Sequence, residues 1–252
     1  MNSALHGQTA LITGAAKRIG RAIALALADE GANIIAHYNT SADEANALYG
    51  ELTERGVECW TIRADFSKPE QYQSLIERAV EIAGGFDILV NSAAVFPSGK
   101  LEEITFDDLV SALEINAWAP FVLARSFADR IGRGKIVNLL DTRIGSYDWS
   151  HVGYILAKKT LAELTKMMAL KFAPDITVNA VAPGLILPPA GQDQSYLDRL
   201  TDTVPLKRHG EPEDVARAVV FLVKSDFVTG EVIYVDGGRH LREFGYGSNL
   251  DK

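Results

Sequence analysis

The sequence is poor in residues that cross-link a chain or bind metals. Its 252 residues include one cysteine, Cys59, which excludes an intrachain disulfide and any cysteine-rich zinc or iron–sulfur site. We therefore expect a reducing, cytoplasmic setting and no metal centre. The chain also lacks a run of about 18 apolar residues, and it begins without the basic segment and apolar core of a signal peptide. We expect neither a membrane span nor a leader segment.

Basic residues are in the minority as well. The 25 Lys and Arg residues are outnumbered by 33 Asp and Glu residues, and the net charge of −8 disfavours a general affinity for nucleic acid or an anionic membrane. An anionic ligand must then be held by a local site. Hydrophobic residues make up 47% of the chain, enough for a full core, and no linker, repeat or low-complexity block divides it. We expect one domain over residues 1–252.

Short apolar runs alternate with segments of helical periodicity along the chain. The apolar runs predict strands over 9–13, 33–37, 58–62, 86–90, 134–140, 176–181 and 231–235. The periodic segments predict helices over 19–27, 42–55, 69–83, 154–172 and 212–223. Nearly continuous apolar strands, each followed by a helix, indicate a Rossmann-like α/β fold, a doubly wound parallel sheet with helices on both faces.

The longest irregular segment begins at Pro183, directly after a predicted strand. Ligands of open α/β sheets lie beyond the carboxyl ends of the strands, so we predict a substrate lid over about 183–205. The alternative is a surface loop without a function.

A glycine turn follows the first predicted strand. Its sequence is Thr13-Gly14-Ala15-Ala16-Lys17-Arg18-Ile19-Gly20, and it opens the first predicted helix. Such a turn lets backbone N–H groups and the positive end of the helix face a pyrophosphate. A glycine turn alone is weak evidence, and its place in the first βα unit is what indicates a dinucleotide site.

The second predicted strand ends without an acidic residue, at His37-Tyr38-Asn39-Thr40-Ser41. Sites selective for NAD place an acidic residue there, and a carboxylate would repel the 2′-phosphate of NADP. Lys17 and Arg18 add positive charge nearby, although solvation of an exposed turn would also explain them. We predict that NADPH is preferred to NADH.

Tyr154 and Lys158 lie four residues apart and therefore on one helical face. An ammonium beside a phenol favours the phenolate and eases proton transfer. Asp141 stands thirteen residues before Tyr154, at the end of a predicted strand, either as a catalytic carboxylate or as a helix N-cap. Asn116 lies in an earlier predicted helix and could hold a water or a backbone carbonyl in a proton path.

Taken in order, these motifs resemble the short-chain dehydrogenase/reductase family over nearly the whole chain. The matching positions are Thr13-Gly14 to Gly20, Asp65, Asn91-Ser-Ala93, Asn116, Tyr154-x-x-x-Lys158, Asn179, Pro183-Gly184 and Val235-Asp-Gly-Gly238. The resemblance implies a homotetramer and a catalytic set of Asn116, Tyr154, Lys158 and the residue at 141. It also implies cofactor contacts at Gly14, Lys17, Arg18, Ile19, Gly20, Tyr38, Asn39, Thr40, Ser41, Asp65, Phe66, Asn91, Ala93, Tyr154, Lys158, Pro183, Gly184 and Ile186.

Two departures resemble the pteridine reductase branch, which includes dihydromonapterin reductases. The usual Asn-Asn-Ala-Gly reads Asn91-Ser-Ala-Ala94, and Asp141 replaces the usual serine. The turn from Gly14 to Gly20, His37-Tyr38, Val228-Thr-Gly230 and Asp236-Gly-Gly-Arg-His-Leu241 also resemble that branch. The branch implies NADPH, a pterin stacked between Phe96 and the nicotinamide, and substrate contacts at Arg18, Phe96, Asp141 and Tyr154. Ala94 departs from the serine of trypanosomatid pteridine reductases, which leaves one polar contact to the pterin unsupported.

Three functions are compatible with these residues. The first is NADPH-dependent reduction of a dihydropterin such as dihydromonapterin, dihydrobiopterin or dihydrofolate, with hydride from the nicotinamide and a proton through Tyr154. The second is a carbonyl reductase such as a 3-oxoacyl-thioester reductase, which Asp141 disfavours because its charge lies near the developing alkoxide. The third is a non-catalytic dinucleotide sensor, which the intact Tyr154 and Lys158 disfavour.

Overall fold

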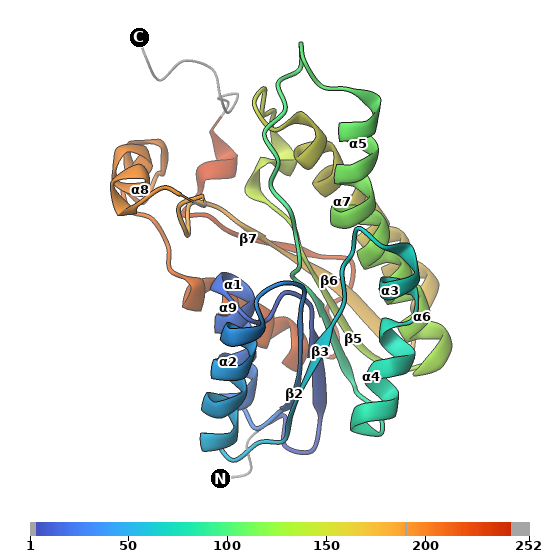
Figure 1. The fold of residues 1–252 in the computed structure, drawn as a ribbon. Helices are drawn as coiled ribbons and strands as arrows, with labels where there is room; N and C mark the ends of the chain where they lie inside the picture. Colours follow the sequence, from blue (N-terminus) through green and yellow to red (C-terminus); the bar gives the residue numbers. More distant parts are fainter. Residues whose placement is uncertain (1–3, 190, 243–252) are drawn as a thin grey trace.

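Seven parallel strands form one sheet in the part of the chain that the structure, a computed structural model, describes: residues 4–189 and 191–242. Their order is β3-β2-β1-β4-β5-β6-β7 (Figure 1). The strands are β1 Thr9–Ile12, β2 Asn33–Tyr38, β3 Cys59–Arg63, β4 Ile88–Asn91, β5 Gly134–Leu139, β6 Ile176–Pro183 and β7 Val232–Val235. The predicted doubly wound α/β fold is confirmed.

The inner strands are apolar on both faces because helices cover both faces. Ala10 and Ile12 of β1 pack into one hydrophobic cluster with α1 and α9, whereas Leu11 between them packs into a second cluster on the opposite face. This alternation follows from the two-residue period of a strand. It explains why the strand sequences show no polar face.

The helices divide between the two faces of the sheet (Figure 1). On one face lie α1 Arg18–Asp29, α2 Ala42–Glu54 and α9 Pro212–Lys224. On the other lie α3 Pro69–Gln73, α4 Leu75–Ala83, α5 Phe106–Leu113, α6 Ala119–Arg130 and α7 Val152–Phe172. A short helix, α8 Gln194–Leu200, follows β6. None of the helices in the described ranges has the length and apolar character needed to cross a bilayer.

Two helical predictions need correction. The helix expected over 69–83 is split into α3 and α4 at Ser74, whose hydroxyl donates to the backbone oxygen of Glu70 at 2.8 Å. A serine hydroxyl that bonds the backbone in this way competes with regular helical bonding. Asn116 lies not in a regular helix but in a π-helical turn, Glu114–Trp118, between α5 and α6.

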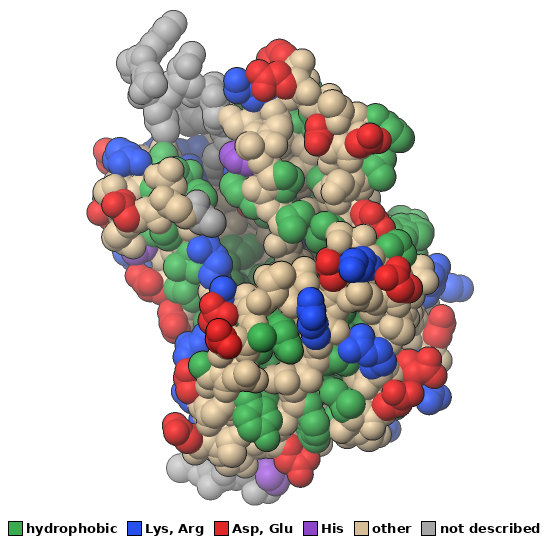
Figure 2. Space-filling view, viewed as in Figure 1, with side chains coloured by type: hydrophobic (Ala, Val, Ile, Leu, Met, Phe, Trp, Pro, Cys, Tyr) green, Lys and Arg blue, Asp and Glu red, His purple; other side chains and the backbone are tan. Residues whose placement is uncertain are grey.

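The order of the sheet creates the position for a ligand. The chain crosses from β1 outward to β2 and β3 and then returns to β4 on the other side of β1, so the strand order reverses between β1 and β4. Open α/β sheets bind ligands outside the carboxyl ends of the strands at such a point. Figure 2 shows the surface hollowed there, beside the part of the molecule that carries α8.

Candidate active site

The glycine turn between β1 and α1 is closely packed. Gly14 has a φ of 67°, and a Cβ on it would lie 3.0 Å from the Cα of Ala93. A Cβ on Gly20 would lie 2.2 Å from the backbone oxygen of Gly14, so no side chain fits there. The first turn of α1 has no side-chain cap and no acidic residue, which leaves its N–H groups available to an anion. The turn therefore fits a dinucleotide pyrophosphate.

His37, at the end of β2, holds this turn in place. Its Nδ1 accepts a hydrogen bond from the backbone N–H of Gly14 at 3.0 Å, and its Nε2 donates to the oxygen of Ala64 at 3.0 Å. The ring is 2% exposed and stacks on Phe66 with ring centroids 4.7 Å apart. Burial lowers the pKa of His37 to about 4, so the imidazole is neutral. Sequence reasoning missed this role because a histidine in an apolar strand carries no spacing signal.

The end of β2 lacks a carboxylate, as predicted. Asn39 and Thr40 are exposed, and Ser41 is the N-cap residue of α2 without a side-chain cap bond. Lys17 pairs with Glu44 at 2.6 Å, so part of its positive charge is offset. A further cation, which the sequence did not point to, lies at this strand end. Arg63 of β3 donates from Nε to the backbone oxygen of Asn39 at 3.1 Å.

Arg18 connects the glycine turn to the segment after β6. Its backbone has a φ of 56°, and its Nη2 donates to the oxygen of Pro188 at 2.8 Å. The predicted lid over 183–205 contains Pro188, the buried Ile186 and α8, while residue 190 within it lies outside the described residues. The structure thus brings Arg18 into contact with the predicted lid, whose movement stays a prediction.

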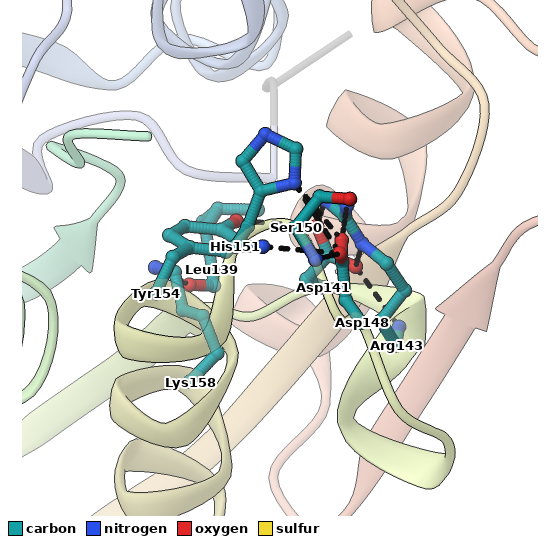
Figure 3. Close-up of polar contacts among 8 residues, drawn as sticks. All are labelled: Leu139, Asp141, Arg143, Asp148, Ser150, His151, Tyr154 and Lys158. Carbon is teal, nitrogen blue, oxygen red and sulfur yellow. Dashed lines mark hydrogen bonds and ion pairs between the residues drawn. The ribbon is translucent and has the colours of Figure 1, made fainter. Parts of the chain in front are cut away.

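Three of the predicted catalytic residues, Asp141, Tyr154 and Lys158, meet at the carboxyl end of β5 (Figure 3). The hydroxyl of Tyr154, on α7, donates to Oδ2 of Asp141 at 3.2 Å. Lys158, one turn later on the same face, is 2% exposed and donates from Nζ to the oxygen of Leu139 at 2.7 Å. Asp141 is also the N-cap of the short 3-10 helix Thr142–Gly145, accepting the N–H of Arg143 at 2.9 Å. Asp141 therefore caps this helix and also contacts Tyr154, so the two alternatives read from the sequence are compatible with each other.

Arg143 is the main residue that sequence reasoning missed. Its Nε and Nη2 donate to the two oxygens of Asp141 at 2.8 and 2.7 Å, and its Nη1 donates to Asp148 at 2.5 Å (Figure 3). Asp148 in turn accepts the backbone N–H groups of Ser150 at 2.8 Å and His151 at 3.1 Å. The available signal was the cluster of charged residues between a strand end and the Tyr154 helix.

The electrostatics of Tyr154 differ from the sequence expectation. Burial and the adjacent Asp141 carboxylate raise the pKa of Tyr154 well above its usual range. The shift is opposite to the one expected from Lys158 alone, because Asp141 accepts the phenolic hydrogen while Nζ of Lys158 lies 5.8 Å from the ring centroid. Tyr154 is therefore protonated at neutral pH, with its hydroxyl directed at Asp141.

The other two ionisable groups also have shifted pKa values. Burial lowers the pKa of Lys158 to about 8, against the opposing effect of Asp141. Burial would raise the pKa of Asp141, but the charge and hydrogen bonds of Arg143 outweigh it and hold that pKa below its usual range. Asp141 is thus ionised at neutral pH, which disfavours the expectation that it relays a proton of its own.

Phe96 lies at the entrance of the site and is 39% exposed. Its ring stacks on His151 with centroids 4.0 Å apart and meets the ring of Tyr154 edge-on at 4.7 Å. The guanidinium of Arg143 also lies over the ring, 4.9 Å from its centroid, so a substrate that stacks on Phe96 must displace His151 or share the ring with these two side chains. Asn116 accepts the N–H of Val95 at 3.0 Å, so it positions the segment before Phe96, and its role in a proton path stays a prediction.

Several other motif residues support the frame of the site. Asn91 donates to Asn138 at 2.9 Å, which ties the ends of β4 and β5 together. A Cβ on Gly184 would lie 2.4 Å from the Cβ of Asp236, a buried carboxylate that accepts the hydroxyl of Thr142. The described residues contain no group of three or more His, Cys, Asp or Glu side chains placed to hold a metal ion.

Comparisons with known proteins find similar chains over most of the sequence. A family model described as enoyl-(acyl carrier protein) reductase matches residues 14–240. A 3-oxoacyl-(acyl-carrier-protein) reductase FabG of Staphylococcus epidermidis is 34% identical over 242 residues, covering 93% of this chain and 99% of the relative. An uncharacterized oxidoreductase of Methylorubrum extorquens is 33% identical over 245 residues, covering 94% of this chain and 99% of the relative.

Solved structures are similar over the same length. FolM alternative dihydrofolate reductase 1 from Brucella suis, in complex with NADP, has a TM-score of 0.89 and 29% identity, covering 94% of this chain and 97% of that chain. The corresponding protein from Brucella canis, also complexed with NADP, has a TM-score of 0.87 and 29% identity, covering 96% and 97%.

Proposed function

The chain belongs to the short-chain dehydrogenase/reductase family of oxidoreductases, and from that premise we propose that it uses NADPH to reduce a dihydropterin to a tetrahydropterin. The observation that carries the proposal is the bond from the Tyr154 hydroxyl to an ionised Asp141, where the family usually has a serine. The similarity to two alternative dihydrofolate reductases supports the same substrate class.

The charge at Asp141 favours reduction of a C=N bond over reduction of a ketone. Hydride addition to a C=N carbon is accompanied by proton transfer to nitrogen, and the nitrogen carries positive charge when the proton arrives first. An ionised carboxylate near the proton donor stabilises that charge, whereas it would repel the alkoxide that develops from a ketone. Tyr154 is the proposed source of the proton, because its phenol is protonated at neutral pH and lies beside Asp141.

NADPH fits the residues at the carboxyl edge of the sheet, and when bound it supplies the hydride. The uncapped first turn of α1 accommodates the pyrophosphate, and the acid-free end of β2 accommodates the 2′-phosphate. We propose that the cofactor is held by Gly14, Lys17, Arg18, Ile19, Gly20, Tyr38, Asn39, Thr40, Ser41, Asp65, Phe66, Asn91, Ala93, Tyr154, Lys158, Pro183, Gly184 and Ile186.

Phe96 is the proposed stacking surface for the pterin, with Arg18, Asp141 and Tyr154 as the other substrate contacts. A flat heterocycle gains stacking area from an exposed aromatic face, and polar edge groups then set its orientation. Phe96→Ala should raise the pterin dissociation constant about 5- to 150-fold, which corresponds to roughly 1–3 kcal/mol of lost stacking. Phe106→Ala is the matched control, because that phenylalanine is 78% exposed at the start of α5.

A second function, reduction of 3-oxoacyl thioesters, is favoured by the 34% identity to FabG. The deciding experiment compares NADPH oxidation with dihydropterins, dihydrofolate and 3-oxoacyl thioesters as substrates. The pterin proposal requires a larger kcat/KM for a dihydropterin or dihydrofolate than for any thioester. Turnover of thioesters alone would refute it, and a chain that turns over none of these substrates while binding NADPH would point to the dinucleotide sensor.

We also propose a homotetramer in a cytoplasmic setting. Helix α7 presents exposed apolar side chains, with Met167 at 65% and Leu170 at 85% exposure, which a subunit contact would cover. Light scattering across a range of protein concentrations measures the mass of the assembly. A mass equal to that of one chain would refute the tetramer.

A further inference from the structure

We propose that Arg143 is a positioning residue that keeps Asp141 ionised and aimed at the hydroxyl of Tyr154, so that Tyr154 begins each turnover with its proton in place. The inference rests on the proposed function, because it takes Tyr154 as the proton donor of that reaction. Nothing in the sequence motifs or in the similarity to other proteins assigns a role to Arg143.

The charged side chains around Asp141 are largely buried. The side chains of Asp141 and Arg143 are 13% and 18% exposed, and that of Asp148 is 4% exposed. A buried carboxylate without a cation takes up a proton, because desolvation disfavours its charged form. The two-pronged contact from Nε and Nη2 of Arg143 supplies that cation in the geometry that binds carboxylates most strongly.

The guanidinium of Arg143 is anchored on the side away from Asp141 as well. Nη1 of Arg143 bonds Asp148, which the backbone N–H groups of Ser150 and His151 hold in place. The ring of Phe96 also faces the guanidinium, with 4.9 Å between the Arg143 Cζ and the ring centroid. Arg143 is thereby held at both ends and cannot swing away from Asp141 without breaking the contact with Asp148.

The carboxylate of Asp141 accepts four hydrogen bonds in the described residues. Oδ1 accepts the backbone N–H and Nε of Arg143, and Oδ2 accepts Nη2 of Arg143 and the hydroxyl of Tyr154. Two donors on each oxygen fill the acceptor sites of a carboxylate. A direct bond from Asp141 to the substrate therefore requires one of these donors to leave, as the Tyr154 hydroxyl does when it turns to the substrate to donate its proton.

Other titratable groups around Asp141 set the background against which this effect is measured. Tyr154 and Lys158 approach from α7, Asp148 and His151 approach from the preceding loop, and Asp236 with His240 lies behind Thr142. Arg143 is the cation with direct hydrogen bonds to both oxygens of Asp141. Its removal should therefore change the protonation of Asp141 more than that of its neighbours.

The test uses two variants of Arg143. Arg143→Met keeps the length of the side chain but removes its charge, and Arg143→Lys keeps the charge but loses the paired hydrogen bonds to the two oxygens of Asp141. Infrared difference spectra of the NADPH-bound protein should show a protonated carboxyl band near neutral pH in Arg143→Met. That band should be absent from the wild type and from the double variant that also carries Asp141→Asn. The acid limb of the kcat/KM profile should move to higher pH by about 1–3 units. Arg143→Lys should restore most of the wild-type profile.

The matched control is Arg125→Met on α6, an exposed arginine over the ring of Phe121 that should leave both readouts unchanged. Asp148→Asn loosens Arg143 without removing it and should shift the acid limb in the same direction by less, which keeps the test valid if Arg143→Met fails to fold. A uniform loss of rate at all pH values, with no new carboxyl band, would overturn the proposal. The infrared readout needs no substrate, so a new band without pterin turnover would refute the proposed function alone.

Discussion

Protonation of one side chain, His37, should lower the free energy of unfolding by roughly 3 kcal/mol when the pH falls from 6.5 to about 4. In the folded chain its Nδ1 must stay unprotonated, because it accepts the N–H of Gly14, and burial lowers its pKa from 6.5 to about 4. In the unfolded chain His37 therefore binds a proton below pH 6.5, whereas in the folded chain it binds that proton only below about pH 4. Stability falls with pH wherever the unfolded state binds more protons, and each pH unit contributes about 1.4 kcal/mol. Above pH 6.5 the group has no effect, and below pH 4 its cost is constant.

Urea unfolding of the wild type and of His37→Gln, measured between pH 7 and pH 4, isolates this effect. The variant should be less stable at pH 7, because it loses the hydrogen bond between the imidazole ring and the N–H of Gly14. The difference in unfolding free energy between wild type and variant should shrink by roughly 3 kcal/mol at pH 4. His6→Gln is the matched control, because His6 is exposed, and it should track the wild type. A stability difference between wild type and His37→Gln that is constant across this pH range would refute the reasoning.

Four further predictions follow from the site. Tyr154→Phe should keep its NADPH affinity, measured by fluorescence titration, and lose about 10²–10⁴ in turnover. The kcat/KM for NADPH should fall as pH rises through about 8, where Lys158 loses its proton while Tyr154 keeps its own, and Lys158→Arg should move this limb to higher pH. Ser41→Asp should narrow or reverse the preference for NADPH over NADH in calorimetric titration, because a carboxylate repels the 2′-phosphate. Gly20→Ala, whose Cβ would lie 2.2 Å from a backbone oxygen, should lower the thermal midpoint and abolish NADPH binding. The control for Gly20→Ala is Gly50→Ala on α2, whose Cβ would meet nothing within 4 Å and which should be neutral or stabilise by up to about 1 kcal/mol.

The fold could be predicted from the sequence because its signals are local and repeated. An inner strand such as β1 is an uninterrupted apolar run, since both of its faces are covered, and the helix after it has a separate periodicity. The two failures arise where side chains compete with the backbone or where the period changes. Ser74 splits one predicted helix by bonding the backbone, and the π-helical turn at Asn116 departs from the 3.6-residue period.

The proximity of Asp141, Tyr154 and Lys158 could also be predicted, because Asp141 follows a strand and the other two lie four residues apart on one helix. The direction in which the pKa of Tyr154 shifts could not be predicted. The spacing brings Lys158 and Tyr154 to one helical face and so suggests a cation acting on the phenol. Burial and the side-chain contacts outweigh this effect, because Lys158 donates to Leu139 while the phenol donates to Asp141. The outcome depends on a turn in which Arg143 folds back two residues to pair with Asp141, and no periodicity in the sequence encodes that pairing. Because Arg143 holds the pKa of Asp141 below its usual range, and burial together with the charged Asp141 raises the pKa of Tyr154, we infer that the state of the proposed proton donor depends on an arginine that acts through Asp141.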